Sequence, residues 1–320
     1  MKIPAVAAGM IVAFASSCAS AQEAYPNKLI RWTLPYSAGS GQDILGRMVG
    51  PKLAERLGQP VVMENRAGAG GLIGFEYVAK SAPDGYNIMM GNNSMLILSA
   101  LRPTPYDPIK DFAPVSLMGW AYSMIMVHQS VPANSIAELV AYSKANPGKL
   151  NYGSPASGTF GHLSTELFKM LTGADMVHIP HKGITGAVQG LITGDVGVLF
   201  GGESLVLPHI KSGKVKLLAA ASQKRSPFFP EVPSAGEQGL KNYDPALWYG
   251  LLVPAATPRP IVTRLNTDMG RILADGQMKE DLAKRGIDAA SGTPEQLGGI
   301  LKTEFGTWQQ VIKTGGIKAD

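Results

Sequence analysis

The sequence predicts an α/β protein that folds into two lobes. Short apolar runs alternate with longer segments of helical period, and this alternation favours βαβ units. After the leader described next, about 300 residues remain, which exceeds the usual size of a single hydrophobic core. We therefore expect two lobes, each a mainly parallel sheet flanked by helices.

The chain begins with the pattern of a secretory signal. Lys2 precedes an apolar run from Ile3 to Ala15, and small residues end in Ala19-Ser20-Ala21. The run is shorter than the roughly 20 residues that a membrane-spanning helix needs. We expect residues 1–21 to be a signal peptide, so that the mature chain starts near Gln22 in the periplasm.

Composition excludes several kinds of site. Cys18, within the signal, is the single cysteine, so the mature chain has no thiol for a disulfide, an iron–sulfur cluster or a zinc site. Acylation of Cys18 is an alternative, although Ala15 stands where a lipoprotein signal favours a larger aliphatic residue. Removing Lys2 leaves 28 basic and 24 acidic side chains without a block of like charge, which disfavours nucleic acid as a partner.

The first strand–loop–helix unit lies near the start of the mature chain. Leu29–Leu34 is predicted to be a strand, and residues 37–41 form a Gly-rich turn. A helix follows and stops at Gly58. Val61–Met63 and Ile88–Met90 repeat the strand pattern.

A second lobe is predicted to begin after the apolar run Met124–Val127. Ser135 and Glu138 have the spacing of a capping box before an apolar helical stripe. The alternation then continues with strands at Leu150–Tyr152, Met176–Ile179, Val196–Phe200 and Lys216–Ala221, and helices at Gly161–Leu171, Thr185–Thr193 and Ser204–Ser212.

The chain is expected to return to the first lobe after a Pro-rich stretch at 227–245. Trp248–Val253 has the pattern of a strand, and Thr257-Pro258 and Thr293-Pro294 open the last helices. Crossings near Gly119–Ser123 and Asp244–Tyr249 would form a hinge beside an interlobe cleft. We predict lobe 1 at 22–121 plus 248–320 and lobe 2 at 122–247.

Three loops share one design, in which an apolar strand is followed by small or polar residues and then a helix. They are Tyr36–Gln42, Ser154–Thr159 and His181–Thr185. Loops of this kind meet at the carboxyl edge of parallel strands, and the N-terminus of each helix favours an anion. Any one loop alone is better explained as an ordinary cap with a turn glycine, but the three together predict a site for a carboxylate or a dicarboxylate.

Candidate ligand residues are the backbone and side-chain donors of these loops and their neighbours. Asp43 would repel an anion, so we expect it to cap or pair internally. Glu203 could meet a ligand hydroxyl, amine or protonated carboxyl, or lie in solvent, and His162 could donate to a carboxylate or pack at the surface. The full set is Tyr36, Ser40, Gly41, Gln42, Asn92, Ser154, Ser157, Gly158, Thr159, His162, His181, Gly183 and Glu203.

The sequence lacks the common motifs of hydrolases, nucleotide-binding proteins and metalloproteases. Its nearest approach to a dinucleotide fingerprint, Gly39–Ile44, fails at the last position. His178 and His181 would point to opposite faces of a strand, so one metal could not easily reach both. We expect no metal, no cofactor and no catalysis, with a periplasmic enzyme that uses the same cleft as the alternative.

Ordered motifs along the whole mature chain show a resemblance to a known family. They are Tyr25-Pro26, Gly58–Val62, Glu64–Gly71, Ala82–Tyr86, Tyr106–Pro108, Asp111–Val115, Pro147–Tyr152, Pro208–Ile210, Lys224–Pro227 and Gly292–Glu295. With these motifs the chain resembles the substrate-binding proteins of tripartite tricarboxylate transporters, the Bug family. The resemblance implies a Venus-flytrap fold and a monomer that delivers its ligand to two membrane subunits. A sensor kinase as the partner is an alternative.

The same resemblance implies where the ligand binds. A carboxylate would be held by the loop after the first strand and by Ser157–Thr159, with backbone amides and bridging waters. The chain departs from the family pattern at Gln42, where threonine is usual, and at His181, where tyrosine is usual. These donors, with the ring of Tyr36, favour a flat or longer dicarboxylate such as terephthalate.

Overall fold

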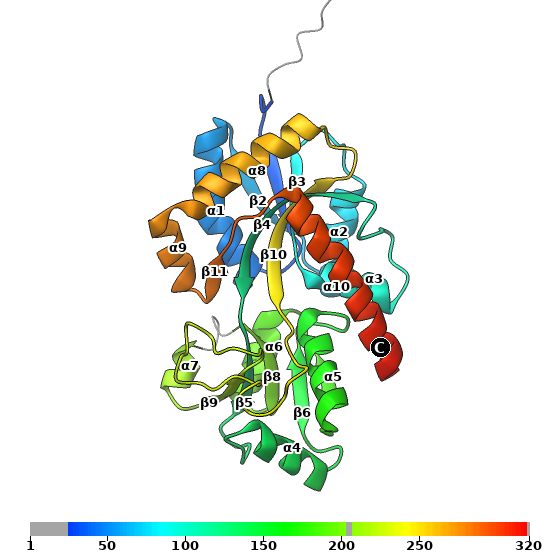
Figure 1. The fold of residues 1–320 in the computed structure, drawn as a ribbon, viewed down its shortest axis with the longest axis vertical. Helices are drawn as coiled ribbons and strands as arrows, with labels where there is room; N and C mark the ends of the chain where they lie inside the picture. The colour runs from blue at the N-terminus through cyan, green and yellow to red at the C-terminus, as the bar shows by residue number, and fades with distance from the viewer. Residues whose placement is uncertain (1–24, 203–206, 319–320) are drawn as a thin grey trace, which may run out of the picture.

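Two lobes, each built on one β-sheet, lie one above the other (Figure 1). The computed structural model describes residues 25–202 and 207–318. The predicted signal peptide at 1–21 with Cys18, the start at Gln22, and the candidate ligand residue Glu203 lie outside the described residues.

The first sheet contains six strands in the order β11-β4-β10-β3-β1-β2. β1 is parallel to β2 and β3, whereas β10 is antiparallel to β3 and β4, and β11 is antiparallel to β4. The strands are β1 (Ile30–Leu34), β2 (Val61–Asn65), β3 (Asn87–Gly91), β4 (Phe112–Ala121), β10 (Leu247–Pro254) and β11 (Ile287–Ala289).

The second sheet contains five strands in the order β7-β6-β8-β5-β9. β6 is parallel to β7 and β8, and β5 is antiparallel to β8 and β9. The strands are β5 (Ser123–His128), β6 (Asn151–Ser154), β7 (Val177–Pro180), β8 (Val198–Gly202) and β9 (Val215–Ala220).

Both sheets are mixed, so the prediction of mainly parallel sheets was wrong. The strands that precede the site loops end at the cleft, whereas β5 and β10 start at the crossings and run away from it. A strand that enters a lobe through the hinge must therefore lie antiparallel to its neighbour. Hydrophobic periodicity carries no information about strand direction, which is why the sequence did not show this.

Helices cover both faces of each sheet (Figure 1). In lobe 1, α1, α8 and α9 share one apolar core, and α2, α3 and α10 share the core on the other face. In lobe 2, α4 and α5 cover one face and α6 the other. The helices are α1 (Gly41–Leu57), α2 (Leu72–Ala79), α3 (Asn93–Leu101), α4 (Ile136–Ala145), α5 (Phe160–Thr172), α6 (Ile184–Thr193), α7 (Leu207–Lys211), α8 (Arg259–Ala274), α9 (Gly276–Ala283) and α10 (Pro294–Gly315), with a 3₁₀ turn at Ala69–Gly71.

Helix ends follow the local sequence closely. Ser40 caps α1 by accepting a hydrogen bond from the Asp43 N–H, and Gly58 ends the helix in the left-handed conformation. Thr293 and Gln296 form a reciprocal capping box at the start of α10. Caps of this kind contribute about 1 kcal/mol each and fix where the helix starts, which in α1 is the edge of the cleft.

The chain passes between the lobes at Tyr122, between β4 and β5, and again before β10. Because the strands on either side of Tyr122 belong to different sheets, we propose the predicted division into 22–121 plus 248–320 and 122–247. Helix α10 also reaches lobe 2, where it lies beside α5 (Figure 1). There Trp308 packs edge-on against Phe160, in a cluster that includes Ile97 of α3. The two lobes are thus in contact.

A buried polar cluster fastens the second crossing to lobe 1. Asn93 donates to the Ala246 carbonyl at 2.9 Å and to the carboxyl of Glu304, and it accepts from the Trp248 N–H at 3.1 Å. Trp248 Nε1 donates to the same Glu304 oxygen at 3.0 Å. Burial raises the pKa of Glu304 to about 7, because the apolar surroundings disfavour the charged form.

This pKa predicts a specific dependence of stability on pH. The folded protein binds the Glu304 proton more tightly than the unfolded chain, whose carboxyl has an ordinary pKa of 4.5. The contribution of Glu304 to stability is therefore full below pH 4.5, falls as the pH rises, and reaches its minimum above about pH 7. Between pH 4.5 and 8, this titration should lower the free energy of unfolding of the unmodified protein by about 3 kcal/mol. We expect Glu304→Gln to abolish this pH dependence. Urea unfolding of both proteins across this range checks it, and a pH-independent difference between them would contradict the assignment.

Candidate functional site

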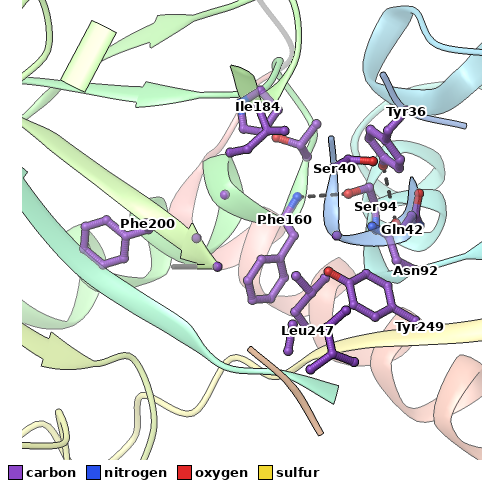
Figure 2. A pocket seen from close by; sticks show the side chains of 18 residues that line it. Tyr36, Ser40, Gln42, Asn92, Ser94, Phe160, Ile184, Phe200, Leu247 and Tyr249 are labelled. Carbon is purple, nitrogen blue, oxygen red and sulfur yellow. Dashed lines mark hydrogen bonds between the residues drawn. The ribbon is translucent and has the colours of Figure 1, made fainter. Parts of the chain in front are cut away.

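A cavity lies between the lobes, and we call it the interlobe cavity (Figure 2). The centre of a water molecule can occupy a volume of about 100 Å³ within it, which is enough for several waters or a small ligand. Lobe 1 contributes its walls from the loop after β1, the start of α3 and β10. Lobe 2 contributes the starts of α5 and α6 and the end of β8.

Four helix N-termini meet at this cavity, those of α1, α3, α5 and α6. Each presents backbone N–H groups that have no acceptor within the helix, and each carries a partial positive charge of about half an elementary unit. The described lining contains no Asp, Glu, Lys or Arg. Positive potential in the cavity therefore comes from peptide dipoles, and no described carboxylate opposes it.

Asp43 lies in the first turn of α1, but its charge is used within lobe 1. Arg47 Nε donates to its Oδ1 at 2.8 Å, and the Gly39 N–H donates to its Oδ2 at 3.0 Å. Asn65 also donates to Oδ1, at 2.9 Å. The prediction that Asp43 caps or pairs internally is confirmed, and its ion pair prevents it from repelling an anion in the cavity.

Gln42 is the unusual polar group of the site. Its side chain is 2% exposed, and neither its Nε2 nor its Oε1 has a hydrogen-bond partner among the described residues. A buried amide left in this state costs about 1–3 kcal/mol. Because Gln42 lines the interlobe cavity, a ligand there can satisfy it.

Tyr36 closes the cavity on the lobe 1 side. Its hydroxyl donates to the Gly70 carbonyl at 3.1 Å and lies 3.4 Å from Asn92 Oδ1, which caps α3 by accepting from the Ser94 N–H (Figure 2). Burial raises the pKa of Tyr36, so the ring is neutral at physiological pH. Tyr36 thus provides an aromatic wall whose hydroxyl is already held in place.

The wall formed by α5 and β10 is mostly apolar. Phe160 comes from α5, and Leu247 and the ring of Tyr249 come from β10 (Figure 2). Phe200 of β8 also lines the cavity, but its ring turns away from it and packs with Phe168 and Tyr243 in the core of lobe 2. The Phe160 N–H crosses the interface and donates to Ser94 Oγ at 3.1 Å. A ligand with polar atoms at the helix ends and an apolar body towards β10 matches these walls.

The predicted site residues separate into four groups. Tyr36, Ser40, Gly41, Gln42, Asn92 and Thr159 line the interlobe cavity. A second cavity next to it is lined by His181 and Gly183, and shares Tyr36 and Thr159 with the first. Ser154, Ser157, Gly158 and His162 line neither cavity, and Glu203 lies outside the described residues.

Ser154 and His162, which line neither cavity, hold the shape of the 154–159 loop instead. Ser154 Oγ lies 2.6 Å from His178 Nε2, and His162 accepts from the Gly158 N–H at 3.1 Å. The rings of His162 and His178 stack with centroids 4.0 Å apart. The ring of His181 lies instead beside Gly153 and Gly190, and among the described residues no group of His, Cys, Asp and Glu is arranged to hold a metal ion.

Ser94, Phe160 and Tyr249 are lining residues that the sequence analysis missed. Ser94 follows β3 in another strand–loop–helix junction, so the design of the three recognised loops could have identified it. Tyr249 comes from the strand that re-enters lobe 1, and Phe160 looks like an ordinary helix residue. The return of the chain to lobe 1 places Tyr249 beside the start of α1, and the contact between the lobes brings Phe160 to the site.

The sequence profile described as "Tripartite tricarboxylate transporter family receptor" matches residues 45–317. The chain belongs to this family. The receptor is 34% identical to protein BugT of Bordetella pertussis (strain Tohama I), over 97% of this chain and 96% of that protein. The resemblance deduced from the sequence motifs is thereby confirmed.

Solved structures show the same fold. Rpa4515 of R. palustris, solved with adipate, is 33% identical with a TM-score of 0.87, covering 92% of the receptor and 99% of that chain. The periplasmic binding protein BugD is 30% identical with a TM-score of 0.86, covering 92% and 100%. MatC from Rhodopseudomonas palustris, with bound malate, is 29% identical with a TM-score of 0.83, covering 90% and 100%. The receptor therefore has the two-lobed fold of periplasmic solute-binding proteins, as predicted. In its described ranges, no helix has the length and apolar character needed to cross a membrane.

Proposed function

We propose that the receptor captures a small carboxylate, preferentially a dicarboxylate with an apolar body, and delivers it unchanged to the two membrane subunits of a secondary transporter. The observation that carries this proposal is the unsatisfied amide of Gln42 in a cavity where four helix N-termini meet. Both features stabilise a guest that brings hydrogen-bond acceptors and negative charge.

The electrostatics favour an anion over a cation or a neutral guest. Helix N-termini attract negative charge, and the Gln42 amide supplies two N–H donors. A cation would find no described carboxylate in the lining. A carboxylate can accept several hydrogen bonds at once, so it uses these donors better than an amide or an alcohol does.

The apolar walls favour a ligand whose body lacks further polar groups. Phe160 and Leu247 offer no hydrogen bond to a hydroxyl or an amine from their side chains, and burying such a group unpaired is unfavourable. A terephthalate-like ring or an unsubstituted alkyl chain fits this surface. Adipate in Rpa4515 is a diacid of the second kind, whereas malate in MatC carries a hydroxyl.

Transport without chemistry agrees with the lining of the site. Its described ionisable side chains are Tyr36 and Tyr249, so it offers neither a carboxylate nor an imidazole as a base. The pattern of residues 1–21 supports a periplasmic location, and family membership supports delivery to a transporter.

A thermal-shift screen with matched neutral compounds tests the proposal. Terephthalate, adipate and malate should be compared with terephthalamide and adipamide, because each diamide keeps the body and removes the charge. A ligand at about 100 times its Kd adds about 2.7 kcal/mol of apparent stability. We expect this stabilisation from at least one diacid, from neither diamide, and full recovery of the acid afterwards. Failure of every acid tested to stabilise the protein, or consumption of the acid, would contradict the proposal.

A further inference from the structure

A second cavity adjoins the interlobe cavity and is larger. It offers about 350 Å³ by the same measure, against about 100 Å³ for the first. Tyr36, Pro155 and Thr159 line both cavities. The two cavities are therefore neighbours that share part of their lining.

Small residues form most of the lobe 1 wall of the second cavity. Residues 67–71 line it, and Ala69 and Gly70 are in the left-handed conformation with φ of 48° and 71°. Such a φ is strained for alanine. A Cβ on Gly70 would lie 3.5 Å from the Ser157 carbonyl oxygen, so this turn closely approaches lobe 2. The wall is thus held in a shape that leaves the cavity open.

The charge of the second cavity is positive. Lys182 lines it, forms no ion pair within the described residues, and has no Asp or Glu beside it in the described lining. The neighbouring ring of His181 is partly buried, which lowers its pKa and leaves it uncharged at neutral pH. Ser37 Oγ is buried there without a partner, and α6 begins directly after Gly183.

We propose that the second cavity is the subsite for the far carboxylate of an elongated diacid, and that Lys182 makes the receptor prefer diacids over monoacids of the same body. This inference rests on the proposed function, since the first carboxylate must lie at Gln42 in the interlobe cavity. The far carboxylate then meets Lys182, the Ser37 hydroxyl and the start of α6. A short diacid spans less of this distance and gains less from Lys182.

Calorimetry with paired ligands tests the role of Lys182. Adipate should be compared with hexanoate, and terephthalate with benzoate, because each pair differs by the far carboxylate. We expect Lys182→Gln to weaken binding of the diacids about three- to tenfold, since an exposed ammonium is partly screened by solvent. Affinity for the monoacids should change by less than about twofold, and Lys182→Arg should keep most of the preference.

Lys149→Gln is the matched control, because it removes the same charge from an exposed loop before the start of β6, at the end of that strand away from the site. It should leave all four affinities unchanged. An equal loss for diacids and monoacids in Lys182→Gln, or no loss for either, would overturn the inference while the proposed function stands. Equal affinity of the unmodified receptor for both members of each pair would overturn the inference together with the proposed preference for a dicarboxylate, and would leave only the capture of a carboxylate. If no acid binds at all, the proposed function itself fails.

Discussion

Replacing Gln42 by leucine is expected to stabilise the ligand-free receptor and to weaken ligand binding. The substitution removes an amide that is 2% exposed and has no partner among the described residues. Losing this unsatisfied group should raise the free energy of unfolding by about 1–3 kcal/mol. The same change removes two donors from the interlobe cavity, so affinity for the acid should fall about tenfold or more. Urea unfolding without ligand and calorimetry with the best acid measure the two effects.

Asn93→Leu provides the matched control, because it applies the same chemical change to a buried amide whose polar atoms are bonded. Asn93 contacts the Ala246 carbonyl, Glu304 and the Trp248 N–H, so its loss should destabilise the ligand-free protein. Gln42→Glu should weaken binding more than Gln42→Leu does, because it adds a negative charge. If Gln42→Leu lowers stability and leaves affinity unchanged, Gln42 is a structural residue and the carboxylate site lies elsewhere.

Gly41→Ala is expected to block the polar end of the interlobe cavity. A Cβ at Gly41 would lie 2.2 Å from Tyr249 Oη and 3.1 Å from its Cζ, so the ring must move. Tyr249 is buried and lines the cavity, and little other space is open to it. We expect a loss of about 1–3 kcal/mol in stability and a fall of about tenfold or more in affinity.

Two further variants separate this effect from a general effect of alanine in a helix. Gly270→Ala lies in α8 with no atom within 4 Å of the new Cβ, so it should keep ligand affinity and keep or raise stability. Adding Tyr249→Phe to Gly41→Ala removes the closest atom and should restore part of the lost stability. Unaltered affinity in Gly41→Ala would show that the ligand does not depend on the start of α1.

The sequence predicted the local design of the site well. Cap residues and turn glycines follow short-range rules, so the end of α1 at Gly58 was predicted from the chain alone, and the helix starts within the predicted turn at 37–41, after its cap Ser40. The internal pairing of Asp43 could also be expected, because an unpaired carboxylate at a helix N-terminus beside an anion site is unfavourable. These are interactions between residues close in sequence or fixed by one strand–loop–helix unit.

The roles of individual side chains within a loop were less predictable. Ser157 and Gly158 belong to a recognised loop, yet neither lines a cavity, and Ser154 and His162 brace that loop from within lobe 2. Whether a hydroxyl in such a loop faces the cleft or its own backbone depends on the partner that packs beneath it. Here the partner is His178, from a different strand.

By itself the sequence determined the α/β class and the convergence of helix N-termini on a cleft, because apolar periodicity and capping rules act over a few residues. The family followed separately, from the resemblance of its ordered motifs. Tertiary structure decided the direction of β5 and β10, the apolar wall made by Phe160 and Tyr249, and the separation of the cleft into two cavities. The strand directions and the place of Tyr249 depend on where the chain crosses between the lobes, and the place of Phe160 and the two cavities depend on how the lobes meet. Contacts between residues distant in the chain arise only when both surfaces are folded and pressed together, so no local pattern encodes them.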